Sequence, residues 1–168
     1  MTETSTALQQ DSDLEWLVNS LLDVPGVIGA VLASQDGLKV TYTRPSRERP
    51  HQGIDSEKAD RLASVISGLY ALANGVATLD GGTGRDLQLG MIKHPAWSLF
   101  VVRAGRGLPA GTPVGLGQQP GEVECALGVM TSPQADEGVI GHEMNKLVKR
   151  VAAHLQTPTR QSGPANGQ

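Results

Sequence analysis

The feature that most restricts the fold of this chain is a continuous apolar run followed at once by a tight-turn signal. Residues Val27–Ala33 are almost all apolar, which is typical of a buried strand. Asp36-Gly37 is a strong signal for a hairpin turn, and apolar side chains alternate after it at Leu38, Val40 and Tyr42. Because a hairpin joins antiparallel strands, the core must be built on a sheet that is at least partly antiparallel.

Capping signals and apolar periodicity predict the first and last helices. Ser12 and Glu15 have the spacing of a capping box, and Pro25-Gly26 ends the first helix. The last helix begins at Asp136 or Ser132. Its apolar stripe has near-ideal helical spacing and consists of Val139, Ile140, Met144, Leu147, Val148, Val151, Ala152 and Leu155.

The middle helix begins at Asp55 or Ser56, ends near Ala77 and carries two different stripes. Because glycine inside a helix costs roughly 1 kcal/mol relative to alanine, a stripe of small residues that includes two glycines favours a packing surface over an ordinary exposed face. The large apolar stripe, which should lie on the sheet, is Leu62, Ile66, Leu69, Ala73 and Val76. The stripe of small residues is Ser64, Gly68, Ala71 and Gly75.

Three further strands complete the expected fold, at Leu87–Lys93, Trp97–Val102 and Val123–Met130. The run Trp97–Val102 is apolar on both faces, which predicts a central strand of the sheet. The element order is then α-β-β-α-β-β-β-α, an α/β chain of the α+β type, with helices covering the faces of a largely antiparallel sheet.

Composition excludes several classes of function. The net charge of −3 is small and of mixed sign, so the chain lacks the basic face that nucleic acid requires. A single cysteine, Cys125, permits no internal disulfide, and its place in an alternating strand predicts a buried, inert thiol. The start of the chain is polar, without a basic or apolar segment of a secretory signal, and no apolar run approaches membrane-spanning length. We therefore expect a cytoplasmic protein without membrane insertion.

The motifs that could carry catalysis or bind a ligand are better explained as ordinary loops and solvent-exposed side chains. The glycine-rich segments Gly81–Gly84 and Gly105–Gly107 lack the Gly-Lys-Ser/Thr of a phosphate loop and do not lead into a helix. The basic residues Lys146, Lys149 and Arg150 suit a solvated helix face. Carboxylates are scattered, and the histidines lack metal-ligand spacing, so no catalytic residue, metal or cofactor is expected; the histidines are His51, His94, His142 and His154.

The domain is expected to span residues 12–155, between disordered tails at 1–11 and 156–168. A polar loop with two prolines occupies Arg44–Ile54. The segment Gly105–Gly121 holds six glycines and three prolines, which predicts a mobile insertion rather than regular structure.

Several motifs, taken in order, resemble the roadblock / dynein light chain domain family, particularly its bacterial members. The resemblance covers about residues 12–155, and the set of motifs in order is more specific than any one of them. The matching stretches are Leu14-Glu15-Trp16-Leu17, Val24-Pro25-Gly26-Val27, Ala30–Ser34 with Asp36-Gly37-Leu38, Ala59–Leu69, and Gly138–Leu155.

This resemblance implies a five-stranded antiparallel sheet with the middle helix on one face and the N- and C-terminal helices on the other. It also implies a homodimer formed through the middle helix and the third strand, in agreement with the stripe of small residues. The chain is longer than the usual pattern at Arg44–Ile54 and Gly105–Gly121. The interface residues expected are Ser64, Ser67, Gly68, Ala71, Gly75, Gln88, Gly90 and Ile92.

Members of the family regulate or scaffold Ras-like small GTPases without binding nucleotide, and the bacterial subgroup is encoded beside a sensor-kinase-like protein and such a GTPase. The resemblance therefore implies a non-enzymatic regulator that biases the nucleotide state or location of a GTPase. The alternatives are a pure scaffold joining the kinase-like protein to the GTPase, and an enzyme or small-ligand sensor, which the lack of a catalytic constellation disfavours. No arginine stands out as a catalytic finger, since Arg61, Arg85 and Arg103 are candidates only by residue type.

Overall fold

The computed structural model describes residues 12–79, 81–82, 88–108, 116–117 and 119–155. Within these residues the α-helices and strands follow the predicted order α-β-β-α-β-β-β-α, with two short 3-10 helices added. The elements are the helix 12–19, η1 (Ser20–Asp23), β1 (Val27–Ser34), β2 (Lys39–Tyr42), α2 (Ser56–Ala77), β3 (Gly90–His94), β4 (Trp97–Arg106), η2 (Pro120–Glu122), β5 (Glu124–Thr131) and α3 (Glu137–Leu155).

The five strands form one sheet in the order β2-β1-β5-β4-β3, and every pairing is antiparallel. The predicted hairpin joins β1 to β2: Gly37, with φ of +82°, donates its backbone N–H to the Ser34 carbonyl over 3.0 Å. The strand predicted to be central, β4, is interior but lies between β5 and the edge strand β3, and β5 occupies the centre of the sheet.

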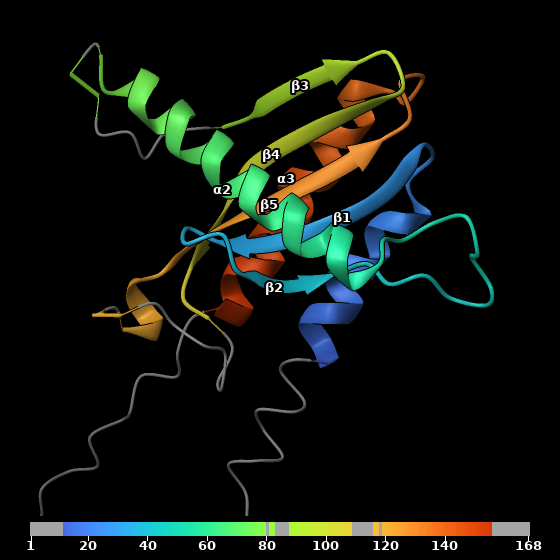
Figure 1. Ribbon diagram of the computed structural model, residues 1–168, viewed down its shortest axis with the longest axis horizontal. Coiled ribbons are helices and arrows are strands. Elements are labelled where there is room, and N and C mark those ends of the chain that lie inside the picture. Colours follow the sequence, from blue (N-terminus) through green and yellow to red (C-terminus); the bar gives the residue numbers. More distant parts are fainter. Residues whose placement is uncertain (1–11, 80, 83–87, 109–115, 118, 156–168) are drawn as a thin grey trace, which may run out of the picture.

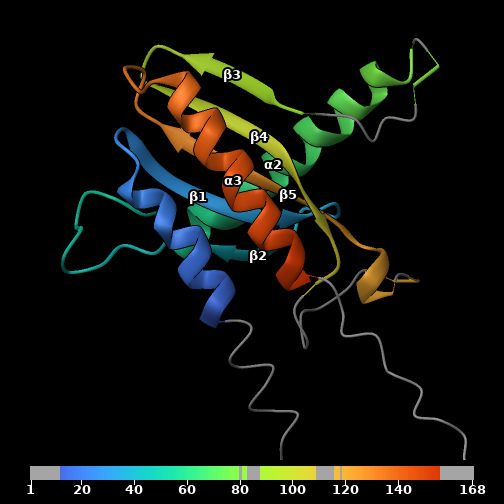
Figure 2. The ribbon, with the colours of Figure 1, turned by 180° about the vertical axis from the view of Figure 1, so that it is seen from behind.

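Helices cover the two faces of the sheet unequally, as Figures 1 and 2 show from opposite sides. The helix α2 lies alone on one face, over a smaller core that includes Ile66, Leu99 and Val101. The N-terminal helix and α3 lie side by side on the other, over a larger core centred on Phe100 and Leu127. This confirms the predicted layer arrangement.

Aspartates cap both long helices. The Asp55 carboxylate accepts the backbone N–H of Lys58 over 2.8 Å, and the Asp136 carboxylate accepts that of Val139 over 3.0 Å. The sequence allowed Asp55 or Ser56 as the start of α2, and Asp136 or Ser132 as the start of α3; the aspartate is the cap in both cases. The start of the first helix at Ser12 adjoins residues outside the described part of the chain. Among the described residues, no helix has both the length and the apolar character needed to cross a bilayer.

The glycine-rich segment after β4 begins later than the sequence predicts. Gly105 and Arg106 belong to β4, and the Gly107 N–H donates to the Val123 carbonyl over 2.8 Å. Leu108 is buried in the core beneath α3. The prediction of an insertion from Gly105 is therefore wrong for its first four residues, because the glycines allow the strand to bulge rather than end. Residues 109–115 and 118 lie outside the described part.

Candidate interaction surface

The first half of α2 is held closely against the sheet. Its buried residues face β1, β4 and β5, and Gly128 of β5 lies directly under Ile66. A Cβ atom added at Gly128 would stand 2.2 Å from the Ile66 Cδ1 atom, so only glycine permits this approach. The prediction that Leu62 and Ile66 cover the sheet is confirmed.

The second half of α2 projects past the sheet, as Figure 1 shows. The 22 residues of α2 span about 33 Å, whereas five strands place the outer two only roughly 19 Å apart. The prediction that Val76 lies on the sheet is wrong for this reason: its side chain is 67% exposed. Tyr70, which the predicted stripe omits, is buried instead.

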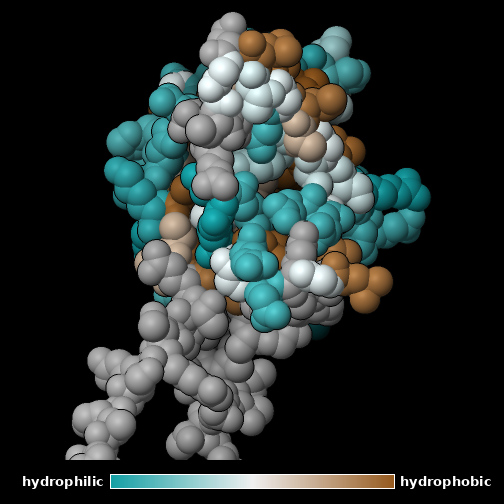
Figure 3. Space-filling model, turned by 90° about the vertical axis from the view of Figure 1, so that its left-hand side faces the viewer, coloured by the Kyte–Doolittle hydropathy of each residue, from teal (hydrophilic) through white to brown (hydrophobic). Residues whose placement is uncertain are grey.

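Four large apolar side chains are exposed along α2 and just beyond its C-terminal end, and we call them the exposed α2 stripe: Val65, Leu72, Val76 and, two residues after the helix, Leu79. The spacing of seven and four residues keeps Val65, Leu72 and Val76 on one side of the helix. Leu72 and Leu79 are 72% and 80% exposed. Figure 3, which views the molecule from the side of the projecting helix end, shows apolar residues at the surface among hydrophilic ones. Exposure of several apolar side chains together marks an interaction site.

The open edge of the sheet at β3 adds to this surface. Among the described strands β3 pairs only with β4, and Leu89 and Met91 beside this edge are 44% and 42% exposed. Gly90 and Ile92 face α2: a Cβ at Gly90 would lie 3.9 Å from Leu69, and Ile92 packs against the core under α2. The expected interface residues Gly90 and Ile92 are therefore half-buried on the α2 side of the strand.

The predicted interface residues divide into open and covered groups. A Cβ atom added at Gly68 or Gly75 would meet nothing within 4 Å, while the turn at Gly37 lies against Ser64 and Ser67. The Ser67 hydroxyl also donates to the Gln35 carbonyl. The exposed residues of the predicted set are Ser64, Gly68, Ala71, Gly75 and Gln88, whereas Ser67, Gly90 and Ile92 are half-buried.

Sequence reasoning missed the exposed α2 stripe. Val65, Leu72 and Leu79 belong to neither predicted stripe, although the length of α2 relative to a five-stranded sheet was a usable signal. A helix about 33 Å long must extend beyond a sheet of this width. Apolar residues near its end are then exposed in a single chain.

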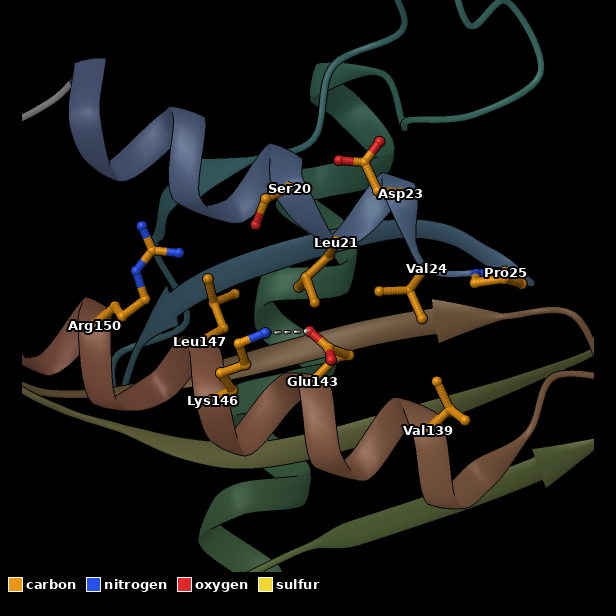
Figure 4. Close-up of a pocket in the computed structure, with 10 residues that line it drawn as sticks. All are labelled: Ser20, Leu21, Asp23, Val24, Pro25, Val139, Glu143, Lys146, Leu147 and Arg150. Carbon is orange, nitrogen blue, oxygen red and sulfur yellow. Dashed lines mark ion pairs between the residues drawn. The ribbon is translucent and has the colours of Figure 1, made fainter.

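The opposite face of the molecule has a groove of about 410 Å³ between η1 and α3. Figure 4 shows Leu21 and Leu147 between the two helices, with charged side chains along α3. Lys146 pairs with Glu143 at 3.7 Å, and the Arg150 guanidinium lies 5.5 Å from the centre of the Trp16 ring. Lys146, Lys149 and Arg150 are exposed, which confirms the predicted solvated helix face.

The remaining candidate groups have ordinary structural surroundings. Cys125 is buried, as predicted, and burial raises the pKa of its thiol to about 12. His94 stacks on Trp97 with ring centres 4.9 Å apart, and His51 and His142 are exposed. No set of three or more potential metal ligands converges within the described residues. Thr83 and Gly84 of the first glycine-rich segment lie outside that part of the chain.

The arginines considered as catalytic fingers are paired where they are described. Arg61 binds Glu57 one helical turn away, at 2.6 Å. Arg103 lies 3.5 Å from the Glu124 carboxylate, which it shares with Arg106. Arg85 lies outside the described residues.

Comparison with known proteins supplies a family. The family model of the Roadblock/LC7 domain matches residues 14–108. A Roadblock/LC7 domain of Streptomyces avermitilis is 32% identical, with a TM-score of 0.64 over 85% of this chain and 98% of that one. No curated protein matches the sequence.

More distant solved structures share the fold. MglB of Myxococcus xanthus is 14% identical, with a TM-score of 0.59 over 84% of this chain and 93% of that one. The gliding protein MglB of Thermus thermophilus is also 14% identical, with a TM-score of 0.62 over 89% and 90% of the two chains. An MglB structure described with a tetrameric arrangement is 15% identical, with a TM-score of 0.65 over 87% and 90%.

Proposed function

Because the chain belongs to the Roadblock/LC7 domain family, we propose that it is a non-enzymatic, homodimeric regulator of a Ras-like small GTPase in the cytoplasm. It binds the GTPase and biases its nucleotide state or its location. The observation that carries this proposal is the exposed α2 stripe beside the open β3 edge. A folded single chain leaves both uncovered, and both are typical of a surface that binds another protein.

A second copy of the chain fits this surface. In a two-fold dimer the same patch meets itself, so two α2 stripes would cover each other while two β3 edges would join two sheets into one. Gly68 and Gly75 would let the helices approach closely and gain dispersion contacts. The tetrameric arrangement described for an MglB structure supports self-association of this fold.

The GTPase would then be regulated by selection. A bound partner shifts the populations of the GTPase's switch conformations only as far as its affinities for those conformations differ. A tenfold preference for one nucleotide state is worth about 1.4 kcal/mol, well within the range of a protein interface. No catalytic group from this chain is needed for such an effect.

The second candidate is a scaffold that joins a sensor-kinase-like protein to the GTPase without changing hydrolysis. The pairing of Arg61 with Glu57 and of Arg103 with Glu124 favours it. An arginine that stabilises the transition state for GTP hydrolysis must leave such pairs to reach the phosphates.

A pull-down tests the proposal and separates the two candidates. Ras-like GTPases from the same genome are loaded with GDP or a GTP analogue and passed over the immobilised protein, and GTP hydrolysis is then measured with and without it. We expect retention that depends on nucleotide state. It should be lost in Leu72→Asp, because this change disrupts the dimer that is proposed to bind the GTPase, and kept in Val139→Asp, a matched change on α3. A changed rate supports the regulator, and an unchanged rate supports the scaffold. Failure of every GTPase to bind in either state would refute both.

A further inference from the structure

A cluster of charged and polar side chains lies where β4 ends and β5 begins, under α2. Its centre is the Glu124 carboxylate, which is 13% exposed. Arg106 donates to its Oε1 atom through Nε and a terminal nitrogen, over 3.1 and 3.0 Å. Arg103 approaches the same oxygen at 3.5 Å, and the Tyr70 hydroxyl donates to Oε2 over 3.2 Å. Two guanidinium groups thus share one carboxylate.

A β-bulge brings the two arginines to one face. Along β4 the partners change from Arg103 opposite Ala126 to Gly105 opposite Cys125, which leaves one extra residue on β4. Strict alternation would send Arg103 and Arg106 to opposite faces, and the extra residue reverses it. Gly105 has φ of +119°, which a residue with a side chain rarely adopts. The bulge therefore depends on glycine, and it orients Arg106 toward Glu124.

The cluster has an excess of positive charge. Burial raises the pKa of Glu124, but the hydrogen bond from Arg106, the charge of Arg103 and the hydrogen bond from Tyr70 outweigh it and hold that pKa below its ordinary value. Burial also raises the pKa of Tyr70, so its hydroxyl is neutral near pH 7. The sum is one positive charge on a chain whose net charge is −3. Among the described residues, neither arginine has a second carboxylate within 4 Å.

The arginines are partly accessible to an external group. The side chains of Arg103 and Arg106 are 33% and 44% exposed, so an external group can reach them. The cluster contacts α2 through Tyr70, which is buried on the side of the helix opposite the exposed Leu72. Asn74 and Arg103 each retain a buried polar atom, Oδ1 and Nε, without a hydrogen-bond partner in the described structure. Within the described residues, the buried Arg103 Nε–H of the cluster is therefore an unused donor.

We propose that Arg103 and Arg106 form a binding site for a carboxylate on an acidic segment of a partner protein that docks alongside α2. The inference rests on the proposed function to the extent that α2 is a protein-binding face, and it names the chemistry that the partner must present there. A planar guanidinium binds a carboxylate through paired hydrogen bonds. Glu124 holds both groups in place, so little side-chain entropy is lost on binding.

The test uses the full chain and a hexaglutamate peptide as probe. The arginine Nε–H signals are followed by NMR during titration, and are assigned by comparison with Arg→Lys variants. We expect saturable shifts at Arg103 and Arg106. Binding should become at least about fivefold weaker in Arg106→Gln, in keeping with the usual strength of charge-assisted hydrogen bonds. The matched control, Arg61→Gln, should bind as the wild type does.

Three outcomes would overturn the proposal. They are equal shifts at every arginine, unchanged affinity in Arg106→Gln with the amide spectrum of β4 and β5 retained, and a stronger response to inorganic phosphate than to the peptide. Hexalysine should cause no shift at either arginine. Because the titration needs no GTPase, a failed titration together with a successful pull-down would refute only the carboxylate-binding site at Arg103 and Arg106. A failed pull-down beside a successful titration would remove only the GTPase.

Discussion

Gly128 shows how a single residue sets the distance between a helix and a sheet. Its missing side chain leaves the space that Ile66 of α2 fills, and Ile66 is fully buried. A larger residue at position 128 cannot be accommodated by turning Ile66 toward solvent. The strain must therefore spread into α2 and β5.

We predict that Gly128→Ala lowers the free energy of unfolding by about 1–3 kcal/mol, the usual cost of overpacking a core. Chemical denaturation measures the change. The cost of Ile66→Ala should be partly cancelled by Gly128→Ala in the double variant, because the new methyl group then occupies vacated space. Additive effects of the two substitutions would contradict the close contact.

Cys125 provides a second prediction at this scale. Its folded-state pKa of about 12 lies above the ordinary value of 9.0 because burial, and to a smaller extent the charge of Glu124, disfavours the thiolate. The unfolded chain loses this proton at lower pH than the folded one. The free energy of unfolding should therefore fall as pH rises from 9 toward 12, by up to about 1.4 kcal/mol per pH unit.

The thiol should also resist modification at pH 8. A disulfide reagent should label Cys125 in the native protein only as fast as local unfolding exposes the thiol. It should label the denatured protein at once. The alkaline loss of stability should be smaller in Cys125→Ala. Rapid labelling of the native protein would show that the thiol is accessible.

At the scale of the element, α3 begins where a side chain satisfies its first free N–H groups. The Asp136 carboxylate accepts the Val139 N–H, and its charge also suits the positive end of the helix. The helix then buries five residues against the sheet. Its stability is therefore coupled to that of the larger core.

We expect Asp136→Ala to lower the free energy of unfolding by about 1 kcal/mol, the typical value of a helix cap. Asp136→Asn serves as the control, because its amide oxygen can accept the same hydrogen bond. Urea unfolding of the three proteins gives the comparison. Equal stability of the alanine variant and the wild type would show that the cap does not contribute.

For the whole molecule, the decisive question is what covers the exposed α2 stripe. A long charged side chain at Gly68 would stand where two helices are proposed to meet, yet it has open space in a single chain. We predict that wild type is a dimer and Gly68→Arg a folded monomer, as measured by light scattering after size exclusion. A stable interface of this kind buries about 1,200–2,000 Å² in total.

The matched control for Gly68→Arg is Gly141→Arg, the same change at an equally open glycine on α3. This variant should remain dimeric. A monomeric wild type at tens of micromolar, a range set by ordinary affinities, would refute the dimer. A dimeric Gly68→Arg would place the interface elsewhere.

Local patterns in the sequence determine the elements and their order. The turn at Asp36-Gly37, the capping aspartates Asp55 and Asp136, and the burial of Cys125 all follow from chemistry within a few residues. The spacing of apolar residues predicts which face of a helix or strand is buried. It does not state how far the neighbouring element extends.

Only the tertiary structure decides the features that depend on two elements at once. Val76 is exposed because α2 is longer than the sheet is wide. Leu108 is buried because β4 continues through a glycine bulge. The same bulge brings Arg106 to Arg103 and Glu124. These contacts are set by relative lengths and registers of segments far apart in the chain, and no local period in the sequence encodes such quantities.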